Sequence, residues 1–299
     1  MFSFTKKQEV LQIGNISIGG QPGRFPTVLI GGLFFSGKPD FSNAKEDIKN
    51  MISISENTGN PAICDFFIKK TEYIDDILSF ISSTIPEKQP FSVDVTDPKV
   101  KVSVLSKLDE IGLLNQTIYN SIHVGITEDE LEALKQHRPN TAILVAFNPK
   151  DTSPDGKIEV LETGANVTKQ GLFSIAKECN IKNILVDTAA LAPGQNSGGS
   201  IAALPVIKEE YGLPTGCAIH NVVEKSTWLN NFSDAKGIVD VASNINISLY
   251  GGDFAIFGSV KHANKVFPII AWQDILISEY VDQYFGVKPS KTHPRRMFY

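Results

Sequence analysis

The chain is poor in the patterns that mark several large classes of protein. It has three cysteines, and Cys64, Cys179 and Cys217 form no CxxC pair, which argues against a disulfide framework or a structural zinc site. No window of about 18 apolar residues occurs, so no transmembrane helix is expected. The start, Met1–Glu9, is too polar for a signal peptide. A reducing, cytoplasmic location is therefore expected.

Charge of one sign is also scarce. The 299 residues include 28 basic and 33 acidic side chains, for a net charge of −5, and no long basic block is present. The basic tail Lys291–Arg296 is short and reads as a solvated end. Because nucleic-acid-binding proteins carry basic patches, no nucleic-acid partner is expected.

The common catalytic signatures are missing too. No HxH or HExxH pattern is present, so no metal site is expected. No lysine ends an apolar strand, as Schiff-base catalysis would need, and no GxSxG elbow occurs. His220 reads as a core residue or a support for its neighbours, and Cys217 as a buried thiol rather than a nucleophile.

What the chain does contain is a repeated strand ending. Five runs of apolar, β-favouring residues each stop at an Asp or Asn: Asp94, Asn120, Asn148, Asp187 and Asn221. Any one of these residues could be a helix cap or part of an Asx turn. As a set they indicate one shared polar cavity, because a buried carboxylate or carboxamide without a hydrogen-bond partner is costly.

Two further aspartates are candidates for the same cavity. Asp65 lies inside the apolar run Ala62–Phe67 and should point into the centre of the fold. Asp97 precedes Pro98, which is a strong helix-start signal, so it reads first as a cap and second as a site residue.

Strands and helices alternate along the chain after an N-terminal hairpin at residues 9–19. The first 24 residues, hairpin and turn, should close the bottom of the fold. Residues 149–156 read as a long polar loop. Eight strands are expected within 27–35, 61–68, 91–94, 117–121, 141–148, 183–187, 215–219 and 253–258.

This regular alternation, without a composition break, favours one α/β domain over residues 1–299. The count of eight strands and the lack of GxGxxG favour a closed (β/α)₈ TIM barrel over an open sheet. Barrel active sites lie at the carboxyl ends of the strands, where the polar residues stand.

A ring of hydrogen-bonding groups with few cations suits a flat heterocycle such as a pterin. Asp can accept from the N–H donors of an aminopyrimidine ring, and Asn can serve donor and acceptor edges together. Gly251-Gly252 and Gly258, around the last strand, leave a phosphate-binding lyase or isomerase as an alternative. A non-catalytic scaffold is a third reading, but a scaffold needs no polar cavity.

Six motifs also carry a resemblance to a known family. They are Gly19–Gly23, Pro26–Gly31, Thr58–Pro61, Ile118–Ile122, Ala146–Asp151 and Val266–Pro268. Through them the chain resembles, from end to end, the MtrH subunit of tetrahydromethanopterin S-methyltransferase and its bacterial relatives. That family is similar to the pterin-binding methyltransferases with (β/α)₈ barrels, which move a methyl group between N5 of a tetrahydropterin and the cobalt of a separate corrinoid protein.

The resemblance implies roles for the strand-end residues. Asp94, Asn120 and Asp187 would hold the pterin ring, and Asn148 would border the same cavity. Asn221 would approach N5, so Asn221 and Asp187 are the expected catalytic residues. Asp65 and Asp97 join the binding set by their position.

One departure from the archaeal pattern bears on the choice of pterin. Only Ser36–Asn43 stand where that pattern has a longer charged insertion, which favours the bacterial branch. That branch uses tetrahydrofolate as methyl acceptor or donor, in methylamine or betaine-type one-carbon metabolism, and tetrahydromethanopterin is the alternative. Because the chain lacks the Asp-x-His-x-x-Gly pattern of corrinoid carriers, the cobalamin should arrive on a partner protein. A homodimer is compatible with the resemblance.

Overall fold

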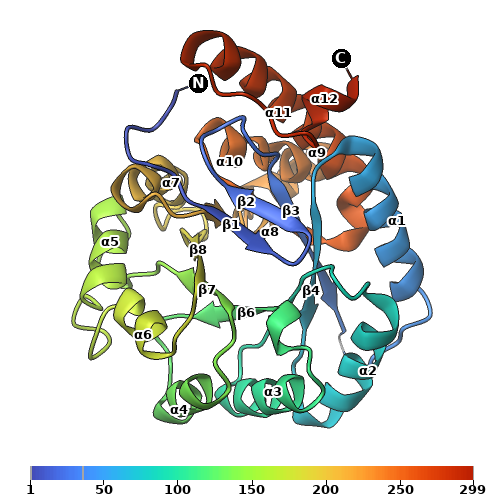
Figure 1. The fold of residues 1–299 in the computed structure, drawn as a ribbon, viewed down its shortest axis with the longest axis vertical. Coiled ribbons are helices and arrows are strands. Elements are labelled where there is room, and N and C mark those ends of the chain that lie inside the picture. Colours follow the sequence, from blue (N-terminus) through green and yellow to red (C-terminus); the bar gives the residue numbers. More distant parts are fainter. Residues whose placement is uncertain (1, 36, 299) are drawn as a thin grey trace.

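The computed structural model is a closed barrel of eight parallel strands surrounded by helices (Figure 1). It describes residues 2–35 and 37–298, so Met1, Ser36 and Tyr299, which belong to segments used above, lie outside the described residues. Neighbouring strands follow the order β10-β3-β4-β5-β6-β7-β8-β9. The predicted (β/α)₈ TIM barrel is therefore confirmed.

The strands of the described chain are short, as expected for this fold. The barrel strands are β3 Val28–Phe34, β4 Ala62–Phe67, β5 Phe91–Asp94, β6 Thr117–Ile122, β7 Thr141–Val145, β8 Asn183–Asp187, β9 Thr215–Cys217 and β10 Phe254–Ser259.

Helices connect these strands and cover the outside of the barrel. The α-helices are α1 Ala44–Thr58, α2 Ile74–Thr84, α3 Pro98–Glu110, α4 Glu128–His137, α5 Pro154–Glu162, α6 Leu172–Glu178, α7 Ser197–Tyr211, α8 His220–Glu224, α9 Ser233–Ser243, α10 Ile245–Leu249, α11 Ala263–Phe285 and α12 Pro294–Phe298. Short 3₁₀ turns are η1 Thr71–Tyr73, η2 Leu114–Gln116, η3 Trp228–Asn231 and η4 Val260–His262. No described helix is long and apolar enough to cross a membrane.

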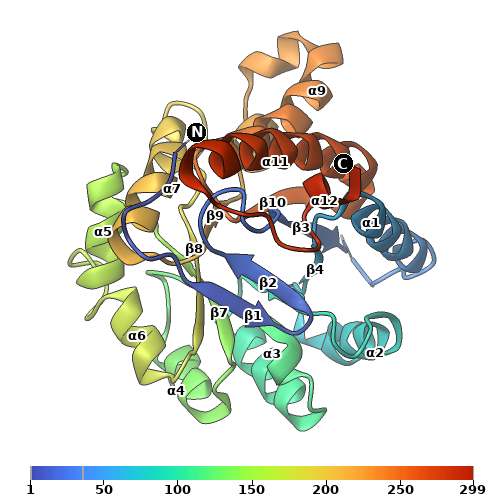
Figure 2. The same ribbon diagram turned by 45° about the horizontal axis from the view of Figure 1, so that its top comes forward.

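The predicted N-terminal hairpin is present as β1 Val10–Ile13 and β2 Ile16–Gly19, paired antiparallel. Figure 2 shows it lying across one end of the barrel. The hairpin isoleucines Ile13, Ile16 and Ile18 are buried in one apolar cluster with side chains of the barrel interior. Burial of these side chains removes apolar surface from water and fills the barrel at the amino ends of its strands.

The same interior positions the polar residues. Three apolar side chains of this cluster stand on alternate strands β4, β6 and β8: Ile63, Ile118 and Leu185. Side chains alternate between the two faces of a strand, so the residue two positions later also points inward, nearer the carboxyl end. Those residues are Asp65, Asn120 and Asp187.

The segment after β7 differs from the sequence prediction. The polar run 149–156 predicts a loop, but α5 begins inside it at Pro154. The Ser153 hydroxyl accepts a hydrogen bond from the Gly156 N–H at 3.2 Å and caps the helix. Ser followed by Pro is a helix-start signal, and the polar composition with Gly156 conceals it.

The connection from β9 to β10 is the largest departure from a minimal barrel. β9 ends at Cys217 rather than at Ile219, and α8, η3, α9 and α10 follow before β10. In Figure 2, α9 projects beyond the ring of barrel helices. Asn221 therefore lies in the first turn of α8 and not at a strand end.

Candidate functional site

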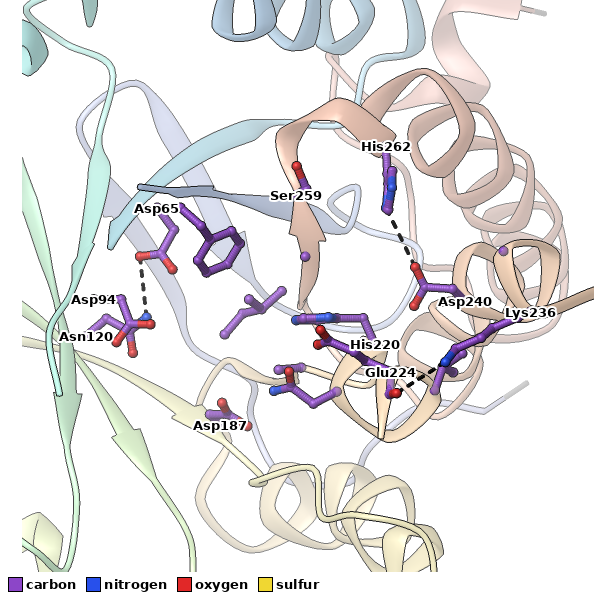
Figure 3. A pocket seen from close by; sticks show the side chains of 17 residues that line it. Asp65, Asp94, Asn120, Asp187, His220, Glu224, Lys236, Asp240, Ser259 and His262 are labelled. Carbon is purple, nitrogen blue, oxygen red and sulfur yellow. Dashed lines mark hydrogen bonds and ion pairs between the residues drawn. The ribbon is translucent and has the colours of Figure 1, made fainter. Parts of the chain in front are cut away.

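A cavity of about 560 Å³ opens at the carboxyl ends of the barrel strands. Figure 3 shows two groups of side chains around it, one from the strands and one from the helices that follow β9 and β10. This volume lies within the usual range of small-molecule sites.

The strand side of the cavity, which we call the floor, consists of Asp65, Asp94, Asn120 and Asp187. Asp94 and Asn120 are direct partners in the register of β5 and β6. The Asn120 Nδ2 donates to Asp65 Oδ1 at 3.5 Å. Asp187 Oδ1 accepts from the Ala189 N–H at 2.8 Å, which fixes the orientation of that carboxyl group.

Burial controls the protonation of the floor. It raises the pKa of Asp94 to about 7, the negative charge of Asp65 adds to the rise, and the Lys101 cation opposes it. Burial also raises the pKa of Asp65. The pKa of Asp187 rises to about 6, again through burial, against the hydrogen bond from Ala189 and the nearby Lys157. Near neutral pH these carboxyl groups can therefore either donate or accept a hydrogen bond.

The helical side of the cavity, the rim, brings in groups that the sequence patterns do not single out. Described rim residues are His220, Asn221 and Glu224 of α8, Lys236 and Asp240 of α9, Ser259 of β10 and His262 of η4. Lys236 Nζ donates to Asn230 Oδ1 at 2.8 Å and to the Glu224 carbonyl at 3.4 Å. His262 Nδ1 lies 3.7 Å from Asp240 Oδ2 (Figure 3).

Cations are few on the described wall of the cavity: Lys236 is its one lysine or arginine, against five carboxyl groups. In the described part of the chain, no group of three or more His, Cys, Asp or Glu side chains is placed to hold a metal ion. The arrangement is therefore suited to a ligand with several N–H donors rather than to a polyanion.

Five of the seven predicted site residues meet in this cavity: Asp65, Asp94, Asn120, Asp187 and Asn221. Asn221 reaches it from α8, opposite the floor, so the tertiary fold brings strand and helix residues together (Figure 3).

Two of the predicted residues are not among the described lining residues, because their side chains serve local structure. The Asn148 Oδ1 accepts from the N–H groups of Lys150 and Asp151 at 2.9 and 3.3 Å, and its Nδ2 donates to the Gly156 carbonyl at 3.1 Å. Asn148 thus braces the turn into α5. Asp97 caps α3, accepting from the Lys99 and Val100 N–H groups at 2.8 and 3.3 Å.

Register explains why Asn148 differs from the floor residues. β7 ends at Val145, and its inward positions are Ile143 and then Val145. Asn148 lies an odd number of residues beyond them and after the strand, so alternation does not carry it inward.

The floor is supported from behind by a buried ion pair. Lys101 Nζ lies 2.9 Å from Glu130 Oε1, and both side chains are 1% exposed. The same ammonium donates to the Ser121 carbonyl at 2.7 Å, and the Tyr119 hydroxyl donates to Glu130 Oε1 at 2.6 Å. These contacts hold the end of β6, where Asn120 stands.

Comparison with known proteins gives consistent results. The family model described as "Tetrahydromethanopterin S-methyltransferase MtrH subunit" matches residues 6–289. The H subunit of the tetrahydromethanopterin S-methyltransferase of Methanothermobacter thermautotrophicus is 36% identical, over 98% of this chain and 98% of that protein. The H subunit of the putative methyltransferase mtx of Methanosarcina mazei is 34% identical, over the same shares of both chains.

Solved structures agree on the fold. The dihydropteroate synthase of Yersinia pestis with a pterine–sulfa conjugate superimposes with a TM-score of 0.59 at 14% identity, over 88% of this chain and 97% of that one. The enzyme of Xanthomonas albilineans in complex with 7,8-dihydropteroate gives a TM-score of 0.54 at 15% identity, over 84% and 93%. The extent of the family match and the full-length relatives together show that this chain belongs to the MtrH family of tetrahydromethanopterin S-methyltransferase subunits.

Proposed function

We propose that this protein is a methyltransferase that moves a methyl group between N5 of a tetrahydropterin and a corrinoid carried by a partner protein. The observation that carries the proposal is the floor of the cavity, where three carboxyl groups and one carboxamide converge from neighbouring and alternate barrel strands. The membership of the family, and the printed names of its relatives as methyltransferase subunits, point to the same chemistry.

The floor fits the edge of a pterin ring. Asp94 and Asp187 would accept from the N–H groups of the aminopyrimidine, and Asn120 would donate and accept beside Asp94. The low-dielectric setting strengthens such hydrogen bonds, and the tight register of β5 and β6 fixes their spacing. Asp65, bonded to Asn120, would hold that amide in place.

Asn221 would face N5 from the rim. A carboxamide can accept from N5–H or donate to the nitrogen without exchanging a proton with it, so Asn221 would orient the lone pair rather than titrate. Cobalt chemistry belongs to the cobalamin of the partner, which we treat as the second substrate. The chain's own task is orientation and control of protonation at N5.

Tetrahydrofolate is the pterin we favour, in methylamine or betaine-type one-carbon metabolism, and the reason is the short Ser36–Asn43 segment. Tetrahydromethanopterin is the alternative, supported by the printed names of the relatives.

The phosphate-binding alternative loses its motif. Gly251 and Gly252 precede β10, at the amino end of that strand and away from the cavity. Gly258 lies near the cavity, but the space beside it is taken by the His220 ring.

Calorimetric titration of the purified protein with tetrahydrofolate and with tetrahydromethanopterin tests the proposal. We expect binding of one pterin at micromolar or tighter affinity, and inorganic phosphate should not compete. Binding of phosphate with no affinity for either pterin would reject the proposal in favour of a phosphate-binding enzyme.

A further inference from the structure

His220 is the imidazole that stands beside Asn221 in the cavity. It opens α8 and lines the cavity, and Figure 3 shows its ring directed from the helix into the space between rim and floor. Within residues 2–35 and 37–298, no side chain or backbone group forms a hydrogen bond or ion pair with the ring. Its nitrogens are therefore available to a ligand.

A glycine makes room for this ring. Gly258 on β10 has φ of +85°, and a Cβ added there would lie 3.0 Å from His220 Nδ1. That separation is tighter than an ordinary contact, and the positive φ is itself unfavourable for other residues. The ring is thus held by packing against the backbone of β10, which positions it without consuming its hydrogen-bonding capacity.

The charges around His220 come from three elements. Glu224 lies one turn further along α8, with Lys225 next to it; His262 belongs to η4; Lys236 and Asp240 face the cavity from α9. Burial lowers the pKa of His220, His262 and Lys225 add to that effect, and the negative charge of Glu224 opposes it. A neutral imidazole at pH 7 is a suitable proton acceptor, and one of moderate basicity also returns the proton readily.

We propose that His220 exchanges the proton of pterin N5 during methyl transfer, while Asn221 orients that nitrogen. This inference rests on the proposed function. When N5 accepts a methyl group from a methylcob(III)alamin co-substrate, its lone pair forms the N–C bond, and the electron pair of the broken carbon–cobalt bond leaves with the cobalt. The N5 proton of the resulting ammonium then passes to neutral His220.

In the opposite direction, protonated His220 returns the proton to N5 of the methylated pterin. The N–C bond can then break with its electron pair remaining on N5, as the methyl group passes to a cob(I)alamin co-substrate. A carboxamide cannot make this exchange at neutral pH, and the floor carboxyl groups lie across the cavity among the ring-binding groups (Figure 3).

The test uses N5-methyltetrahydrofolate, or its methanopterin counterpart, with free cob(I)alamin as methyl acceptor, followed by the absorbance of methylcobalamin from about pH 5 to about pH 8. We expect the rate of the unchanged protein to rise as the pH falls. His220→Gln should lower turnover by about a hundredfold or more and flatten that pH profile, with unchanged pterin affinity by calorimetry.

Glu224→Gln provides a second, independent measurement. Removal of its negative charge should lower the pKa of His220 further, so the pH profile should shift to lower pH. The matched control is His137→Gln, which removes an imidazole bonded to Asp109 on the outside of the barrel and should change neither rate nor profile.

A pH profile that keeps its shape and position in both His220→Gln and Glu224→Gln would overturn the assignment and leave His220 a packing residue. If the unchanged protein binds neither pterin, the proposed function itself fails. Binding and turnover with an unaffected profile would reject only the role of His220.

Discussion

Asp94 of β5 and Asn120 of β6 stand directly opposite each other in the parallel register of the barrel. This pairing places a carboxyl and a carboxamide side by side at one level of the cavity floor. Asn120 also reaches Asp65, on the far side of β5, at 3.5 Å. Three consecutive barrel strands thus contribute one connected polar surface.

Replacement of the floor carboxylates should weaken pterin binding. Asp94→Asn and Asp187→Asn each exchange an acceptor for a group that offers a donor to the ring, and hydrogen bonds to charged groups contribute about 1.5–3 kcal/mol. We therefore expect calorimetric affinity for the tetrahydropterin to fall about 10- to 100-fold. Asp97→Asn is the matched control, because Asn also caps helices well and Asp97 serves α3. Unchanged affinity in both floor variants would reject their role as ring-binding groups.

The raised pKa of Asp94 predicts a dependence of stability on pH. Burial first, and then the charge of Asp65, raise the pKa of this group from 3.8 to about 7 in the folded protein. Between these values the folded state binds more protons than the unfolded state, so the free energy of unfolding should decrease as the pH rises from about 4 to about 7. Urea unfolding of Asp94→Asn should show a flatter dependence over that interval. An equally steep dependence in the variant would mean that Asp94 does not titrate there.

Asn221→Ala should separate turnover from binding. The side chain faces the cavity from α8 rather than from the floor, so its loss should lower the rate of methyl transfer by about a hundredfold through misorientation of N5, with pterin affinity largely intact. Asn115→Ala makes the same change on an exposed turn at the opposite end of β6 and should alter neither quantity. Full turnover by Asn221→Ala would remove Asn221 from the mechanism.

Asn148→Ala should affect stability and not the ligand. The side chain makes three hydrogen bonds within the turn into α5 and is 1% exposed, so its truncation leaves buried backbone groups without partners. We expect a loss of about 1–3 kcal/mol in the free energy of unfolding, measured with urea, and unchanged pterin affinity. A drop in affinity without a loss of stability would instead restore the sequence-based expectation that Asn148 borders the pterin.

The ion pair behind β6 should be essential to stability as a pair. Lys101→Met leaves Glu130 charged and buried, and the breaking of such a pair costs about 3–5 kcal/mol. The double variant Lys101→Met/Glu130→Gln removes both charges and should recover part of that loss in urea unfolding. If Lys101→Met alone were as stable as the parent, the buried pair would not support the end of β6.

The fold and part of the site were predictable for the same reason. Alternation of strands and helices is a local property of the chain, and the period of two within a strand decides which face each residue takes. Asp65, Asn120 and Asp187 follow interior residues by two positions, so their direction was implicit in the sequence. Ser153-Pro154 also carried a local signal for α5, which the polar composition of the run concealed.

The amino-acid sequence by itself thus determined the barrel, the hairpin beneath it, the family and the polar floor, because these depend on hydrophobic periodicity and on motifs contiguous in the chain. The tertiary structure alone decided the rim. Glu224, Lys236, Asp240 and His262 come from separate helical segments that carry no shared pattern, and they meet only because the β9–β10 connection folds over the barrel mouth. It also decided that Asn148 braces a turn and that His220 fits against Gly258, since both outcomes depend on contacts between atoms that sequence spacing does not specify.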